Sequence, residues 1–165
     1  MIQPYDMLWS GPSLEGAVLK MTGAERGRTV GRERAVGELR GLLARLYRSF
    51  VAWGSLYGDL DLRFEQERRR EEVVGLLDEF PGQYLARSMW VEPATRKKIE
   101  KFMEKSKDLY SDFVADISAQ GYLQTRALMA NRVSRELGSL KKEADAALKT
   151  ERAGTRQPRW RKRVR

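Results

Sequence analysis

Apolar residues recur every three or four positions along much of the chain. The first such stretch spans residues 33–57, and its apolar positions are Val36, Leu39, Leu43, Leu46, Phe50, Trp53 and Tyr57. Alternating steps of three and four place these side chains on one face of a helix, as in a coiled-coil seam. We therefore predict a long helix over this stretch.

A second apolar pattern follows Gly58-Asp59, a dipeptide typical of turns. Its apolar residues are Leu60, Leu62, Phe64, Val73, Leu76, Leu77 and Phe80, with the charged block EQERRREE at residues 65–72 between them. Proline has no amide hydrogen for the helical ladder, so Pro81-Gly82 predicts that the second helix ends or is kinked near Phe80.

Two further stretches have the same spacing. Proline suits the first helical position, so Pro93 predicts the start of a third helix. Its seam is Ile99, Met103, Ser106, Tyr110, Phe113 and Ile117, and Gly121 is placed to cap its end. The seam of the fourth predicted helix is Met129, Val133, Leu137, Leu140, Ala144 and Ala147, and this helix should reach about Thr150.

These patterns predict an all-α protein, an antiparallel bundle of three to four long helices arranged as two helical hairpins. Short connections after the first and third helices favour antiparallel neighbours. We assign the bundle to residues 32–150. Residues 1–31 lack a sustained period and predict a poorly ordered lead-in, with Met21 as an alternative start. Residues 151–165 predict a disordered basic tail.

Composition narrows the possible chemistry. The chain has no cysteine and no histidine, which excludes disulfides, thiolate nucleophiles and imidazole ligands or bases. We find no nucleophile–base pair, phosphate-binding loop or metal-ligand cluster. We therefore predict a protein that is not an enzyme and needs no cofactor. No apolar run is long enough for a membrane span or a signal peptide, which favours a soluble cytoplasmic protein.

Positive charge is concentrated in the tail. The net charge is +9, of which residues 151–165 contribute +6 through seven basic residues and one glutamate. Arginines around a tryptophan can neutralise phosphates and stack on bases, or bind anionic lipid headgroups. The candidate anion-binding residues of the tail are Arg156, Arg159, Trp160, Arg161, Lys162, Arg163 and Arg165. A merely solubilising end is the alternative.

A second set of candidates lies near the start of the third helix, at Lys97, Lys98 and Lys101. The helix dipole disfavours cations at this position, so a compensating negative charge is expected. An anionic partner could supply it, and so could the nearby Glu100 or an acidic neighbouring helix.

Other charged and aromatic residues have structural explanations. Asp108, Asp112 and Asp116 recur every fourth position but lie away from the seam, so we expect them to face solvent or flank the seam rather than bind a metal. Glu65 and Arg69 are spaced for a surface ion pair. The remaining expectations are helix capping by Asp59 and Asp61, and packing of Trp90 onto the core rather than onto a partner.

Residues 34–57 and the segment YLARSMWVEPATRKKIEKF (84–102) resemble a group of bacterial helical proteins of unknown function. Those proteins share a plan of long helix, aromatic loop, proline and second long helix. The resemblance implies a helical bundle and nothing about activity. Pro81-Gly82 departs from it, because unbroken helix is expected there.

Two functional hypotheses follow. The first is a non-enzymatic interaction or scaffold protein that binds a protein partner or self-associates, with the tail as a tether to an anionic partner. The second is a nucleic-acid-associated protein that binds phosphates through the tail and the lysines of the third helix. An anionic membrane surface is a further possible partner of residues 151–165.

Overall fold

The computed structural model describes residues 23–55 and 62–154, and all the regular secondary structure in these ranges is helical. Its elements are α2 (Gly23–Gly54), α3 (Leu62–Ser88), α4 (Pro93–Gln120), α5 (Tyr122–Arg132), the π-helix η1 (Val133–Leu137) and α6 (Gly138–Gly154). The last three follow one another without a break and form one long helical segment. The expectations for Asp59 and Asp61 lie outside the described residues.

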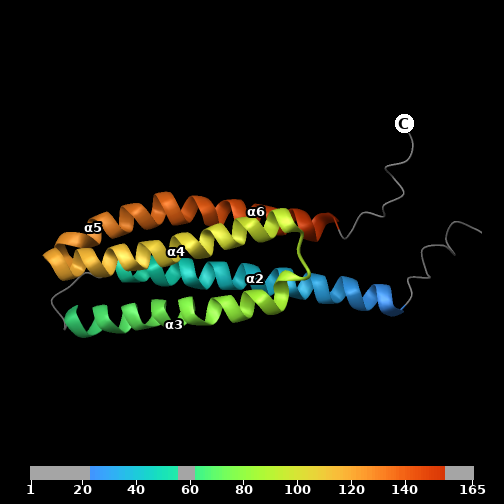
Figure 1. Ribbon diagram of the computed structural model, residues 1–165, viewed down its shortest axis with the longest axis horizontal. Helices are drawn as coiled ribbons and strands as arrows, with labels where there is room; N and C mark the ends of the chain where they lie inside the picture. The colour runs from blue at the N-terminus through green and yellow to red at the C-terminus, as the bar shows by residue number, and fades with distance from the viewer. Residues whose placement is uncertain (1–22, 56–61, 155–165) are drawn as a thin grey trace, which may run out of the picture.

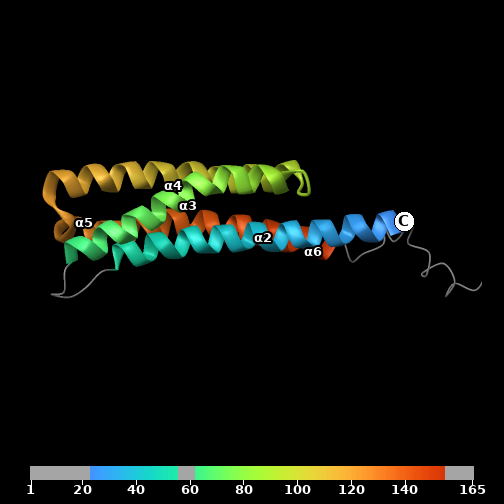
Figure 2. The same cartoon turned by 90° about the horizontal axis from the view of Figure 1, so that it is seen from below.

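The helices form an elongated antiparallel bundle (Figure 1). α2 packs along α3 on one side and along α6 on the other, while α4 packs along α5 and α6. The start of α2, the α3–α4 connection and the end of α6 lie at one end, which we call the terminal end (Figures 1 and 2). The predicted all-α bundle is confirmed.

The core follows the predicted seams closely in α2. Its seam residues from Val36 to Trp53 are all buried. In α4 the most deeply buried stripe also includes Phe102 and Leu109, whereas Met103 and Tyr110 lie at its edge. The inward face of α4 is thus centred about one position away from the predicted seam. The α2 seam is covered within a single chain and needs no second copy to bury it.

The bundle extends beyond the predicted boundaries at both ends. Helix α2 begins at Gly23, so the predicted lead-in is wrong for residues 23–31, while residues 1–22 are not among the described ones. Helix α6 continues to Gly154, and Glu151, predicted to be part of the tail, is buried. Few apolar residues mark either extension, which is why hydrophobic spacing did not find them.

Pro81 lies inside α3, which continues to Ser88, so the alternative that the helix ends near Phe80 is wrong. Proline cannot donate to the carbonyl of Leu77 one turn earlier. Figure 2 shows α3 running obliquely to α4 near its start and alongside α4 near its end, so the helix changes direction along its length. Phe80 and Tyr84 are buried on either side of the proline, and this packing keeps the chain helical through it.

The π-helix accommodates an irregularity in the last seam. Met129, Val133 and Leu137 are separated by two successive steps of four, which would drift around a regular α-helix. The amide of Gly138 instead donates to the carbonyl of Val133, five residues earlier, and this wider turn keeps all three side chains fully buried. A Cβ at Gly138 would lie 3.3 Å from the Tyr47 hydroxyl, so the glycine makes room for Tyr47.

A single residue joins α4 to α5. Gly121 has a φ of 88°, which favours glycine, and its amide donates to the Ile117 carbonyl (2.8 Å), as its predicted capping role requires. The next residue, Tyr122, donates its hydroxyl to the carbonyl of Trp53 at 2.5 Å. This bond ties the α4–α5 junction to the last turn of α2. We call this region, with Phe50 and Phe113, the aromatic end.

Trp90 fastens the α3–α4 connection to α2. A Cβ at Gly31 would lie 3.1 Å from the indole ring, which shows how closely the ring approaches the helix. Trp90 is half-buried, and the neighbouring Val91 is buried. The indole therefore approaches α2 closely, although Trp90 is not among the half-buried residues that pack against the main core.

Candidate anion-binding surfaces

The structure describes three of the ten predicted anion-binding residues. Lys97, Lys98 and Lys101 are exposed within the first three turns of α4, and within residues 23–55 and 62–154 none of them forms an ion pair. Lys105, farther along α4, does have an acidic neighbour, because its ammonium lies 2.6 Å from the Glu136 carboxylate. The seven predicted residues between Arg156 and Arg165 lie outside the described residues.

Antiparallel packing places the start of α4 at the terminal end (Figure 1), and the three lysines belong to the N-terminal part of that helix. Helix α6 finishes at the same end, so the basic sequence that follows Gly154 begins there. Arg26 and Arg28, which are exposed in the first turns of α2, add to this charge. The fold thus brings the start of the basic tail sequence to the same end as the three lysines, which precede it by more than fifty residues.

The electrostatics at the start of α4 favour a negative charge. Glu92 precedes the helix, but its side chain does not cap it. Arg96 is half-buried, and its Nε has no hydrogen-bond partner in the described part of the chain. The helix dipole adds partial positive charge at the same place. Nearby, burial and a hydrogen bond to Glu100 raise the pKa of Tyr84, so its hydroxyl is a neutral donor.

A buried carboxylate holds the terminal end together. Glu151 accepts hydrogen bonds from Nη2 of Arg32 (2.8 Å) and from the backbone amide of Glu92 (2.8 Å). Its side chain is 5% exposed. One side chain of α6 therefore links α2 to the start of α4, and we call this arrangement the Glu151 clasp. It fixes the end of α6 relative to the start of α4.

The aspartates of α4 lie at the surface of the bundle. Asp108 and Asp112 are exposed, as predicted, and Asp112 accepts a hydrogen bond from Arg132 at 2.8 Å. Arg132 also binds Glu136, and the bonds from Arg132 and Lys105 lower the pKa of that carboxyl. Among the described residues no group of three carboxylates is placed to hold a metal ion.

Sequence reasoning missed a basic groove between α2 and α3. The cavity has a volume of ≈ 330 Å³. Its lining residues, which we name the arginine groove, are Arg45, Arg48, Ser49, Ala52, Arg69, Glu72 and Leu76. A smaller cavity of ≈ 230 Å³ adjoins it and shares Arg45. The one sequence feature that could have indicated this groove is the position of Arg45 and Arg48 next to the buried seam residues of α2.

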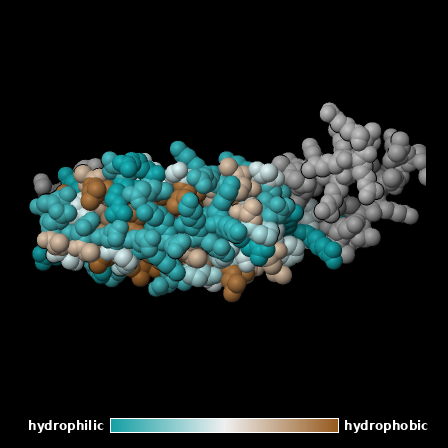
Figure 3. Space-filling model, turned by 45° about the horizontal axis from the view of Figure 1, so that its top comes forward, coloured by the Kyte–Doolittle hydropathy of each residue, from teal (hydrophilic) through white to brown (hydrophobic). Residues whose placement is uncertain are grey.

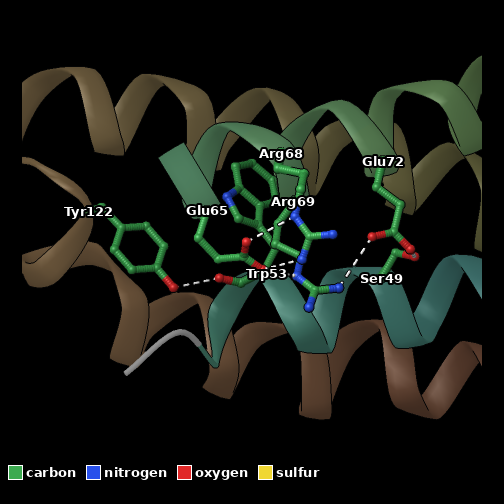
Figure 4. Close-up of polar contacts among 7 residues, drawn as sticks. All are labelled: Ser49, Trp53, Glu65, Arg68, Arg69, Glu72 and Tyr122. Carbon is green, nitrogen blue, oxygen red and sulfur yellow. Dashed lines mark hydrogen bonds and ion pairs between the residues drawn. The ribbon is translucent and has the colours of Figure 1, made fainter. Parts of the chain in front are cut away.

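The α3 wall of this groove is internally neutralised (Figure 4). Arg69 donates to Glu65 (3.0 Å) and to Glu72 (3.3 Å), so the predicted pair of Glu65 with Arg69 is present. The buried Ser49 hydroxyl donates to the other oxygen of Glu72 at 3.0 Å. Arg45 and Arg48 face this wall from α2.

The face of the molecule drawn in Figure 3 is mostly hydrophilic. On this face, hydrophobic residues form small separate patches among polar ones. Within the described ranges, no helix is long and apolar enough to cross a membrane. No protein family, curated protein or solved structure matches the chain.

Proposed function

We propose that this chain is a non-enzymatic helical interaction protein whose terminal end binds an anionic partner. The observation that carries the proposal is the convergence of Lys97, Lys98 and Lys101 with the point where the basic segment 155–165 leaves α6. These lysines have no carboxylate partner in the described part of the chain. The bundle thus exposes three lysines at the end where the basic sequence begins.

The physical advantage lies in joining two weak sites. Each exposed cation alone contributes little to the free energy of binding an anion, because solvent and salt screen its charge. A short connection makes the second contact intramolecular once the first has formed, which raises the overall affinity. The Glu151 clasp matters here because it fixes the start of the basic segment relative to α4.

Nucleic acid is the second candidate, as a specific class of anionic partner. It is favoured by Trp160 among the tail arginines, since an indole can stack on an unpaired base while arginines neutralise phosphates. Binding of this kind would be insensitive to sequence and strongly dependent on salt.

The test is the binding of full-length protein to single-stranded and duplex DNA at several salt concentrations. With roughly five to seven phosphates neutralised, affinity should fall by about two orders of magnitude or more between 50 and 200 mM salt. A variant ending at Gly154 keeps the Glu151 clasp, so it should lose binding without a change in melting temperature. Trp160→Ala should weaken single-strand binding more than duplex binding.

A triple variant, Lys97→Ala/Lys98→Ala/Lys101→Ala, tests the surface of α4. The matched control is Lys107→Ala/Arg135→Ala/Lys142→Ala, which removes three exposed charges elsewhere on the bundle. The first variant should lose affinity several-fold more than the second.

Preference for anionic vesicles, with a blue shift of Trp160 fluorescence, would identify a lipid partner instead. Absence of binding to either polyanion at 50 mM salt would reject the terminal end as an anion-binding site.

A further inference from the structure

We propose that the arginine groove binds a small molecule bearing a phosphate group, held by Arg45 and Arg48. The groove lies between α2 and α3, and the proposal does not depend on the function proposed for the terminal end. Three guanidinium groups and one carboxylate line it, so it carries a net positive charge. Such a groove attracts anions and excludes cations.

The two arginines of α2 keep donors free for a ligand. Nε of Arg48 donates to the Ala44 carbonyl of its own helix at 3.2 Å, which leaves its terminal amino groups unused. Within residues 23–55 and 62–154, Arg48 has no carboxylate within ion-pair distance. Arg45 lies 3.8 Å from Glu79, beyond hydrogen-bond distance. Both guanidinium groups can therefore turn to an anion between them.

The α3 wall is held in place by its own bonds. Glu72 is bound through one oxygen by Ser49 and through the other by Arg69. Arg69 is bound in addition by Glu65. Glu65 also accepts a hydrogen bond from Arg68 at 2.9 Å, so Arg68 and Arg69 together offset Glu65 and Glu72. The remaining positive charge of the groove belongs to Arg48 and to Arg45, whose guanidinium lies 3.8 Å from Glu79. Figure 4 shows Arg69 lying between the two glutamates.

Size and chemistry favour a phosphate over a carboxylate. A phosphate carries up to two charges and can accept hydrogen bonds from two guanidinium groups at once, whereas one guanidinium fork satisfies a carboxylate. The cavity of ≈ 330 Å³ lies at the lower end of the range for small-molecule sites. Ala52 and Leu76 add an apolar wall for the body of the ligand.

The experiment titrates full-length protein with pyrophosphate at low salt by calorimetry and follows backbone amides by two-dimensional NMR. We expect saturable binding with the largest shifts at the amides of Ser49 and Ala52. The variant Arg45→Ala/Arg48→Ala should lose these shifts and at least tenfold in affinity. The control Arg34→Ala/Arg135→Ala removes two exposed charges outside the groove. It should retain the amide shifts and the affinity for pyrophosphate. The terminal basic segment is common to all these proteins, so its contribution cancels.

Glu72→Gln gives a second, opposite test. Removing the negative charge from the groove should tighten pyrophosphate binding severalfold, an effect that loss of folding cannot produce. Equal affinities in the two double variants would overturn the proposal, as would unshifted Ser49 and Ala52 amides in the unmodified protein. Hexaglutamate binding at the same amides as tightly as pyrophosphate would assign the groove to acidic peptides and reject a phosphate site.

Discussion

The aromatic end and the terminal end of the bundle are held together by different interactions. At the aromatic end, Trp53 and Phe113 are fully buried with ring centroids 6.1 Å apart, and Phe50 contacts both rings. At the terminal end, the Glu151 clasp joins α6, α2 and the start of α4 through an ion pair and a backbone bond. The first end depends on apolar packing, whereas the second adds the charged contacts of the clasp to the packing of Trp90 and Val91.

This difference separates stability from surface function. Apolar burial and ring packing do not rely on ion pairs, so the stability of the aromatic end should depend little on electrostatic screening. The terminal end has fewer large apolar side chains to bury and exposes cations around a single buried carboxylate. The ligand binding that we propose there would not need to disturb the core. The following changes test the comparison.

The largest loss of stability is expected from Phe113→Ala at the aromatic end. Removing a fully buried ring between Phe50 and Trp53 should cost about 3 to 5 kcal/mol of unfolding free energy. Leu123→Ala is a suitable control, because Leu123 is 54% exposed and should cost far less. Chemical denaturation measures both. Equal losses would contradict apolar packing as the source of stability at this end.

Glu151→Ala should have the next largest effect, about 1 to 3 kcal/mol, because it leaves Arg32 and the Glu92 amide without their acceptor. Glu151→Gln retains an acceptor but loses the charge, so it should cost less than alanine. Hydrogen exchange should show faster opening at the start of α4 in the alanine variant. Unchanged exchange there would mean that the clasp does not hold the terminal end.

Tyr122→Phe removes only the hydroxyl that donates to the Trp53 carbonyl. The ring and its burial remain, so the expected cost is about 1 kcal/mol. Thermal unfolding compared with Phe113→Ala would separate the polar from the apolar contribution at the aromatic end. A loss as large as that of Phe113→Ala would show that the hydrogen bond, rather than the rings, dominates.

The smallest expected effect is on the pH dependence of the melting temperature. The hydrogen bond from Arg40 (2.6 Å), followed by the one from Lys149, lowers the pKa of Asp145 below its ordinary value of 3.8. A lowered pKa stabilises the folded state above that value, and this contribution disappears as pH falls through the folded-state pKa. Asp145→Asn should therefore lower the melting temperature slightly at pH 7 and not at pH 2. A difference that persists at pH 2 would contradict this linkage.

Sequence patterns predicted the parts of the fold that depend on apolar spacing or on proline and glycine. The seam of α2, the start of α4 at Pro93 and the cap at Gly121 follow directly from such signals. The course of α3 did not, because burial of Phe80 and Tyr84 outweighs the lost hydrogen bond at Pro81. Helical spacing also cannot distinguish two neighbouring rows of apolar residues on one helix. This is why Met103 and Tyr110 were predicted to face the core in place of Phe102 and Leu109.

The candidate sites were harder to predict because they depend on which helices meet. Lys97 was singled out from its position on α4, but only the antiparallel arrangement places it at the end where α6 finishes. Glu151 resembled a tail residue until its contact with Arg32, 119 positions earlier, was known. The arginine groove combines residues of two helices, none of which is unusual in its own sequence context.

The π-helix has a consequence for changes in chain length. A residue deleted from a regular helix rotates everything after it by about 100°, which would turn a buried seam toward solvent. The turn that starts at Val133 contains one residue more than an α-turn, so deleting the exposed Ser134 would convert it to regular helix and leave the buried faces of α5 and α6 aligned. A corresponding deletion of Ala44 in α2 would misplace Leu46 and Phe50. The α5–α6 segment is thus where this bundle can lose a residue and keep its core.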